Sequence, residues 1–246
     1  MKFTAIIPAR YASTRFPGKP LALLGDKPVI EWVYNTAKST LGEAYVATDD
    51  ERIYETVESF GGNAVMTSPN HKSGTDRIQE AVRKIKGSHD VIVNIQGDEP
   101  FIHPSQIETV CKCFDDLQTQ IATLGKPFSG GMNETANPNS PKIVTDLKGY
   151  AMYFSRSVIP YIRGCEYEKW NAHFCYLKHI GLYAYRCNVL EQITQLQQSP
   201  LELAESLEQL RWLQNGYRIK VGITDIETIG IDTPEDLARA NQILEK

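Results

Sequence analysis

Short apolar runs alternate with amphipathic stretches along the first half of the chain. Four runs are apolar or β-branched, as buried strands are: residues 4–7, 44–48, 63–66 and 91–95. Three stretches between them repeat apolar positions at helical spacing: residues 28–39, 51–60 and 74–85. This alternation predicts an α/β fold, with a mostly parallel sheet and helices on both faces, for at least residues 1–126.

The alternation stops after Phe128. The segment SGGMNETANPNSPK is rich in Gly, Asn, Ser and Pro and is typical of a loop. Strand-like runs then follow within residues 142–186, at 143–145, 151–154 and 181–185. Because this region departs from the strand-helix pattern and is rich in aromatic residues, we interpret it as an inserted lid or dimerisation arm.

The last part of the chain returns to regular elements. The pattern predicts a helix over 200–215, a strand over 218–223 and a closing helix over 234–244. Thr233 is the expected cap of the closing helix, with Pro234 at its first position. We therefore expect residues 1–246 to form one α/β domain, with residues 1–126 as its nucleotide-binding half.

Composition narrows the functional classes. A 246-residue chain with 41% hydrophobic and 23% charged residues can bury a substantial core. The formal net charge of −4 argues against a general nucleic-acid binder, which needs a basic face. No segment approaches the roughly 20 apolar residues of a membrane helix. The five cysteines include no CxxC pair, which favours reduced thiols in the cytoplasm.

In an open parallel sheet, ligands bind beyond the carboxyl ends of the strands, so the loops after the apolar runs are informative. The first is PARYASTRFPGKP at residues 8–20, whose polar side chains are those of Arg10, Ser13, Thr14, Arg15 and Lys19. Three cations, two hydroxyls and a permissive glycine suit a triphosphate. A Walker A loop would need glycine in place of Ser13 and a hydroxyl in place of Pro20. A solvated basic loop is the alternative.

The second loop, MTSPNHKSGTDR at residues 66–77, leads into a predicted helix. Ser73 and Gly74 open that helix, where backbone N–H groups favour an anion or a base edge. Ser73 equally fits a simple helix cap. Arg77, one turn further, can reach the same ligand or serve as a surface charge.

The third loop, NIQGDEP at residues 94–100, places Asp98 directly after the strongest apolar run. Gly97 makes room there, and Pro100 forces Glu99 into an extended conformation. A carboxylate at this point suits Mg2+ held against nucleotide phosphates, because magnesium takes one or two protein carboxylates. A turn aspartate is the alternative.

Asp232 is a second candidate metal ligand. It lies just before the Thr233 cap and therefore at the end of an element. Asp236, inside the following helix, is interpreted as a capping charge instead.

Eight strings make a family recognisable: IPARYASTRFPGKPL, ATDDERI, SGTDR, VNIQGDEP, YAMYFSRSVIP, KHIGLYAY, LEQLRWL and IDTPEDL. Together they closely resemble the 3-deoxy-manno-octulosonate cytidylyltransferases over nearly the full length. The resemblance implies a Rossmann-like nucleotidyltransferase fold, Mg2+ dependence and a cytoplasmic homodimer. It also implies a role in lipopolysaccharide biosynthesis, with CTP and a 3-deoxy sugar acid as substrates.

The resemblance also implies roles for individual residues. The residues expected around CTP are Arg10, Ser13, Arg15, Lys19, Ser73, Gly74, Arg77 and Gln96. Asp98 and Asp232 are the expected metal ligands, and with Arg15 and Lys19 they form the expected catalytic group. The residues expected around the sugar acid are Arg156, His179, Tyr183, Glu208 and Gln209.

The sugar-site residues also have purely structural interpretations. Arg156 fits a surface ion pair, His179 a buried hydrogen-bonded histidine and Glu208 a charge on a solvated helix face. Tyr183 or Tyr185 fits ordinary strand packing, because the two alternate with apolar neighbours.

Rival functions are weaker. An N-acylneuraminate cytidylyltransferase also handles an α-keto sugar acid, but the first and third loops favour the 3-deoxy substrate. A nucleotide-sensing module without turnover does not need Asp98 and Asp232 beside a cationic loop. A dinucleotide-dependent oxidoreductase lacks its GxGxxG after the first strand. The motifs fit 3-deoxy-manno-octulosonate and its 8-amino analogue equally, and they leave the number of metal ions and the extent of lid motion open.

Overall fold

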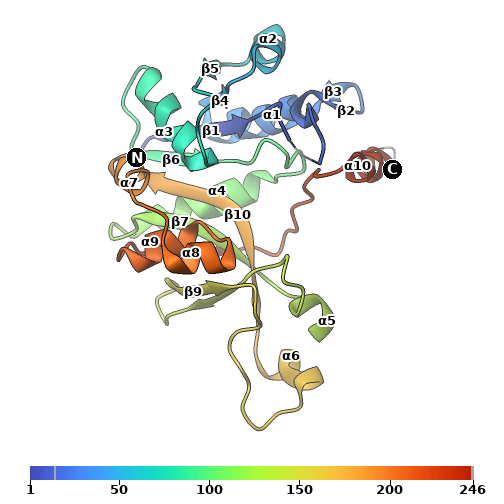
Figure 1. Cartoon of the computed structure of the whole chain (residues 1–246), viewed down its shortest axis with the longest axis vertical. Helices are drawn as coiled ribbons and strands as arrows, with labels where there is room; N and C mark the ends of the chain where they lie inside the picture. Colours follow the sequence, from blue (N-terminus) through green and yellow to red (C-terminus); the bar gives the residue numbers. More distant parts are fainter. Residues whose placement is uncertain (14, 245–246) are drawn as a thin grey trace. The chain divides into compact units, whose positions relative to one another are not determined.

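The computed structural model describes residues 1–13 and 15–244 (Figure 1). Thr14, one of the two hydroxyl residues of the first loop, lies outside the described residues. The chain divides into two compact units. The first contains Met1–Glu108, Tyr185–Thr194 and the segment from Thr228 onward, and the second contains Thr109–Ala184 and Gln195–Glu227.

The first unit contains a parallel sheet in the order β6-β1-β4-β5. Its strands are β1 (Phe3–Ala9), β4 (Ala44–Thr48), β5 (Ala64–Met66) and β6 (Val91–Asn94). The central strand pairs Ile6 with Tyr45 on one side and with Asn94 on the other. All four strands predicted from the apolar runs are confirmed.

Helices pack against these strands. They are α1 (Val29–Leu41), α2 (Glu51–Ser59), α3 (Gly74–Lys84) and α7 (Cys187–Ile193). The helix α10 (Pro234–Leu244) contacts the short strand β2, and α4 (Pro104–Lys112) leads into the second unit. Figure 1 shows α1 running alongside β1, and the two are in contact. Fully buried side chains such as Ile6, Val33 and Val46 form the core between helix and sheet. The segment between β1 and α1 contains the 3-10 helix η1 (Lys19–Leu21). Two short strands follow, β2 (Leu23–Leu24) and β3 (Lys27–Pro28), which pair antiparallel.

The second unit contains β7 (Ile121–Pro127) and β11 (Ile219–Ile223), which pair in parallel. The strands β8 (Lys142–Thr145) and β9 (Ala151–Ser155) pair antiparallel. The strand β10 (Leu177–Arg186) pairs antiparallel with β8 and neighbours β7 in the strand order. The strands predicted within residues 142–186 are therefore present. The segment between β9 and β10 contains only two short helices, η3 (Tyr167–Lys169) and α6 (Trp170–His173). The remaining short helices are η2 (Cys113–Asp115) and α5 (Met132–Thr135).

The single helix predicted over residues 200–215 is wrong. Two helices, α8 (Pro200–Glu205) and α9 (Gln209–Gln214), are separated at Ser206, whose φ of 51° is left-handed. The break turns α9 back, so that the Arg211 guanidinium donates to the Glu202 carboxylate of α8. Both side chains are buried. The spacing of apolar residues, on which the prediction rested, does not indicate an ion pair across such a break.

All five cysteines carry free thiols. Among the described helices, none combines the length and the apolar character needed to cross a bilayer.

Candidate active site

Lys19 connects two carboxylates from distant parts of the first unit. Its Nζ donates to Asp98 Oδ2 at 2.5 Å and to Asp232 Oδ1 at 3.2 Å. Lys19 begins η1, directly after Gly18, whose φ of 72° gives the loop a left-handed turn that glycine adopts without strain. The Lys19 side chain is only 12% exposed, so its charge acts in a poorly solvated place.

The loop after β6 is packed directly on the end of β1. A Cβ on Gly97 would lie 2.9 Å from the carbonyl oxygen of Pro8, so this position requires glycine. The backbone carbonyl of Asp98 accepts a hydrogen bond from Ile231 N–H at 2.8 Å. This bond holds the segment before α10 beside the loop and places Asp232 next to Asp98.

The start of α10 holds Asp232 from the other side. Asp236 Oδ2 accepts from the N–H groups of Asp232 at 3.0 Å and Thr233 at 2.9 Å, while Thr233 Oγ1 accepts from Asp236 N–H at 3.2 Å. The predicted capping roles of Thr233 and Asp236 are confirmed. The Arg15 guanidinium lies 3.2 Å from Asp232 Oδ2, so the loop after β1 contributes two cations to this carboxylate.

Glu99 adds a third carboxyl group, which the sequence pattern did not point to as a site residue. Burial and the negative charges of Asp98 and Asp232 raise its pKa to about 8, and Lys19 opposes them only partly. Its Oε2 has no hydrogen-bond partner within the described part of the chain. The only sequence signal was its position beside Asp98.

This donor set fits a hard divalent cation. Mg2+ is typically held by one or two carboxylates and completes its shell with phosphate and water oxygens. Asp98 and Asp232 meet that requirement, since one oxygen of each reaches the same ammonium. No group of three or more His, Cys, Asp or Glu residues suited to a metal occurs within residues 1–13 and 15–244.

A cavity of about 210 Å³ opens beside this cluster. Its lining includes six residues of the predicted nucleotide and metal sites: Arg10, Ser13, Lys19, Gly74, Gln96 and Asp98. The cavity lies at the carboxyl ends of β1 and β6, where open parallel sheets bind ligands. The structure thus brings the first and third loops together with the start of α3.

Three polar side chains of this cavity already have partners. An Arg10 guanidinium nitrogen donates to the carbonyls of His71 at 2.5 Å and Ser73 at 3.5 Å. Ser13 Oγ accepts from a backbone N–H at 3.4 Å, and Gln96 Nε2 donates to Asn94 Oδ1 at 3.2 Å. The Arg10 contact ties the first loop to the second.

Ser73 and Arg77 have clear structural roles. Ser73 Oγ accepts from Asp76 N–H at 3.1 Å and therefore caps α3. The Arg77 side chain is fully buried and donates to Thr67 Oγ1 and, at 2.7 Å, to Asp49. The alternative of Arg77 as a surface charge is wrong. Asp49 follows β4 in the string ATDD, and nothing in the sequence predicted its pairing with Arg77.

The residues expected around the sugar acid belong to the second unit. The Arg156 guanidinium donates to three main-chain carbonyls, those of Glu205 at 2.6 Å, Pro138 at 2.9 Å and Ser206 at 3.3 Å. This clamp replaces the surface ion pair considered as an alternative. Because a guanidinium carries five N–H donors, one on each terminal nitrogen can still bind a carboxylate.

His179 and Tyr183 lie on one face of β10, and their ring centroids are 5.4 Å apart. His179 Nε2 lies 3.2 Å from Thr123 Oγ1, and burial lowers the pKa of the imidazole to about 4. Glu208 directly precedes α9 and is partly buried rather than on a solvated face. The adjacent Gln209 is buried, and its Nε2 has no hydrogen-bond partner among the described residues.

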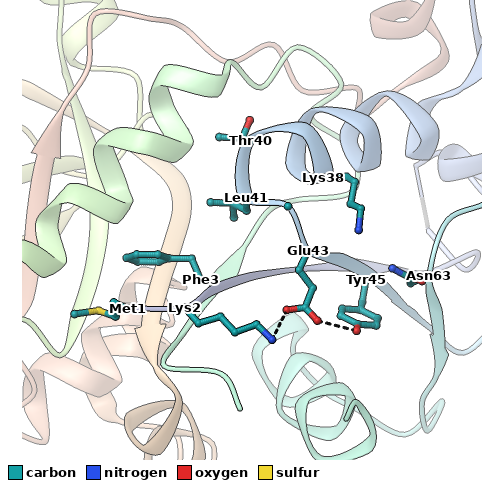
Figure 2. A pocket seen from close by; sticks show the side chains of 10 residues that line it. Met1, Lys2, Phe3, Lys38, Thr40, Leu41, Glu43, Tyr45 and Asn63 are labelled. Carbon is teal, nitrogen blue, oxygen red and sulfur yellow. Dashed lines mark hydrogen bonds and ion pairs between the residues drawn. The ribbon is translucent and has the colours of Figure 1, made fainter. Parts of the chain in front are cut away.

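A larger hollow lies elsewhere in the first unit. Figure 2 shows this hollow, of about 760 Å³, where β1 and β4 begin. The figure shows Glu43 bonded to Lys2 and Tyr45, with Lys38 and Asn63 nearby. Volume alone would favour this hollow as a ligand site. It lies at the amino ends of the strands, however, and its carboxylate, Glu43, is already bonded to Lys2 and Tyr45. The smaller cavity beside Asp98 has the chemistry of a nucleotide site.

Comparison with known proteins agrees with this geometry. The sequence model of a protein family described as cytidylyltransferase matches residues 4–221 of this chain. A relative from Phocaeicola vulgatus named 3-deoxy-manno-octulosonate cytidylyltransferase is 63% identical, over 100% of this chain and 98% of its own. A relative of the same name from Porphyromonas gingivalis is 55% identical, over 96% and 94% of the two chains.

A solved structure described as CMP:2-keto-3-deoxy-manno-octonic acid synthetase complexed with CTP superimposes with a TM-score of 0.91 and 42% identity. It covers 100% of this chain and 99% of the other. The chain belongs to the cytidylyltransferases and, within them, to the 3-deoxy-manno-octulosonate cytidylyltransferase family.

The lowered pKa of His179 predicts a specific pH dependence of stability. Between its unfolded value near 6.5 and about 4, the unfolded chain binds a proton that the folded chain does not. Stability is therefore complete above pH 6.5 and falls as the pH drops toward 4. With about 1.4 kcal/mol for each pKa unit, the loss by pH 4.5 is on the order of 2–3 kcal/mol.

Urea unfolding at pH 7.5 and pH 4.5 measures this effect against a His179→Gln variant. We expect the wild-type protein to lose more unfolding free energy between the two pH values than the variant loses. Equal losses would show that His179 titrates alike in the folded and unfolded chain.

Proposed function

We propose that this protein transfers the cytidylyl group of CTP to 3-deoxy-manno-octulosonate and releases pyrophosphate. The observation that carries the proposal is the cluster of Lys19, Asp98 and Asp232 beside the 210 Å³ cavity. The names of the 63% and 55% identical relatives support the choice of sugar acid. The structure that matches with a TM-score of 0.91 contains CTP, which supports the choice of nucleotide.

In the proposed reaction, the anomeric hydroxyl oxygen of the sugar acid attacks the α-phosphorus of CTP. The new P–O bond forms as the bond from the α-phosphorus to the β-bridging oxygen breaks, and the hydroxyl proton passes to solvent. Negative charge grows on the departing pyrophosphate. Lys19 and Arg15, which both contact Asp232, are the proposed groups that neutralise that charge.

Asp98 and Asp232 are the proposed ligands of Mg2+, which supplies positive charge to the phosphate oxygens when bound. Arg10, Ser13, Ser73, Gly74, Arg77 and Gln96 are the other proposed residues of the nucleotide site. Of these, Arg77 acts from a buried position, through the Thr67 and Asp49 contacts that anchor α3. Gly74, at the start of α3, lines the cavity, and a helix start suits a phosphate or a base edge.

The proposed sugar site uses Arg156, His179, Tyr183, Glu208 and Gln209. Arg156 is the proposed partner of the sugar carboxylate, through the two N–H groups outside its clamp. The buried amide of Gln209, with Nε2 unpaired among the described residues, suits a ligand hydroxyl. His179 stays neutral at physiological pH, because its pKa is about 4, and so suits hydrogen bonding rather than charge pairing.

We further propose a homodimer that works in the cytoplasm for lipopolysaccharide biosynthesis. Residues 142–186 are the proposed lid and dimerisation arm, and large apolar side chains on this arm are exposed, including Met152, Tyr161 and Phe174. Such side chains often mark a protein interface. The five free cysteines suit a reducing compartment.

A pyrophosphate-release assay tests the reaction. Wild-type protein should release pyrophosphate from CTP with 3-deoxy-manno-octulosonate, much more slowly with N-acetylneuraminate, and not after removal of divalent metal. Asp98→Asn and Asp232→Asn should each lower turnover by about 100-fold or more, because an amide is a poor ligand for magnesium.

The asparagine variants keep an oxygen that can accept from Lys19, so thermal unfolding should show an intact fold. Glu55→Ala, which removes an exposed carboxylate of α2, is the matched control and should keep full activity. Full turnover of either asparagine variant at ordinary Mg2+ would remove that residue from the metal site.

Sedimentation at micromolar concentration tests the homodimer. We expect twice the mass of one chain. Tyr161 is 72% exposed, and Tyr161→Glu should weaken association because the glutamate would place a charge in an apolar interface. Leu117→Glu, at an exposed apolar residue outside the arm, is the control. A monomeric wild type would contradict the proposal.

A further inference from the structure

The loop over residues 67–73 connects β5 to α3 (Figure 1) and contacts Arg10. Arg10 donates to the main-chain carbonyl of His71 at 2.5 Å and to that of Ser73 at 3.5 Å. Both acceptors are backbone atoms of this loop. The conformation of the 67–73 loop therefore sets the position of a cation that lines the nucleotide cavity.

The ends of this loop are anchored by groups already described. Thr67 N–H donates to the carbonyl of Thr48 at 2.8 Å, and Thr67 Oγ1 contacts buried Arg77. Ser73 caps α3 at the other end. Between these anchors, residues 68–72 are largely exposed or partly exposed and belong to no helix or strand.

Glu80 holds this middle part from the second turn of α3. Its carboxylate accepts from Ser68 N–H with both oxygens, at 3.0 and 3.2 Å. The same carboxylate contacts His71 Nε2. One side chain therefore joins two loop residues that are three positions apart, and the second of them presents its carbonyl to Arg10.

Charge stabilises this arrangement. Burial raises the pKa of Glu80, but Lys84, the Ser68 N–H and His71 outweigh it and hold the pKa at about 2. Glu80 is thus a carboxylate throughout the working pH range. Lys84 Nζ lies 2.6 Å from Glu80 Oε1. The same Nζ donates to the carbonyl oxygen of Met66, at the end of β5, at 2.8 Å.

We propose that Glu80 is a positioning residue for nucleotide binding, which acts through the 67–73 loop on Arg10. This inference rests on the proposed CTP site. Without the Glu80 carboxylate, the loop keeps its two end anchors but samples other conformations in its middle. If only a fraction of molecules presents the His71 carbonyl to Arg10, the apparent affinity for CTP falls by that fraction. Chemistry in the bound complex is largely unaffected, because CTP binding selects the ordered loop.

Steady-state kinetics of Glu80→Ala and Glu80→Gln test the proposal. We expect Glu80→Ala to raise KM for CTP about tenfold while kcat stays within about threefold, the split that weakened binding produces. Glu80→Gln keeps an acceptor for Ser68 N–H and should restore part of the affinity. Glu55→Ala is the matched control and should behave like wild type.

A double-mutant cycle with Arg10→Ala separates positioning from general destabilisation. If Glu80 acts through Arg10, Glu80→Ala should change KM for CTP much less in the Arg10→Ala background than in wild type. A purely structural role would give equal effects in both backgrounds, and that result would overturn the proposal. So would an unchanged KM in Glu80→Ala.

The same cycle distinguishes this inference from the proposed CTP site. If Arg10→Ala alone leaves KM for CTP unchanged, then the assignment of Arg10 to the nucleotide fails. If Arg10→Ala raises KM while Glu80→Ala does not, the nucleotide site stands and the positioning role of Glu80 fails. Thermal unfolding of each variant shows whether the fold is intact.

Discussion

The first unit is organised around one ammonium group shared by two carboxylates. Lys19 joins the loop after β1, the loop after β6 and the segment before α10 through Asp98 and Asp232. Two carboxylates so close would repel each other without a cation between them. The same repulsion makes the pair a suitable site for a divalent cation.

Backbone packing makes this cluster precise. Gly97 lets the loop after β6 approach Pro8, and the bond from Ile231 N–H to the Asp98 carbonyl brings the distant Asp232 segment alongside. Arg77 and Glu80 then act from α3, one buried against Asp49 and one over the 67–73 loop. Neither places its charge primarily toward the cavity. Both charges are instead used in contacts that hold loops next to α3.

Local patterns predicted the elements well, and long-range pairs were beyond them. The strand at 44–48 and the helix at 234–244 match the structure because apolar periodicity and a Thr233 cap are local signals. The helix over 200–215 failed because Ser206 adopts a left-handed conformation that periodicity does not register. The loops after the strands indicated the candidate site, but the raised pKa of Glu99 and the Arg77–Asp49 pair depend on contacts made only in the folded chain.

The most direct test of the central claim is the turnover of Lys19→Met at saturating Mg2+, CTP and sugar acid. Lys38→Met, which removes an exposed lysine of α1 at the hollow in Figure 2, is the matched control. If Lys19 neutralises the departing pyrophosphate, its loss should lower kcat by about 100-fold or more while KM for the sugar acid changes little. A kcat within about threefold of wild type would show that the charge of Lys19 does not stabilise the transition state.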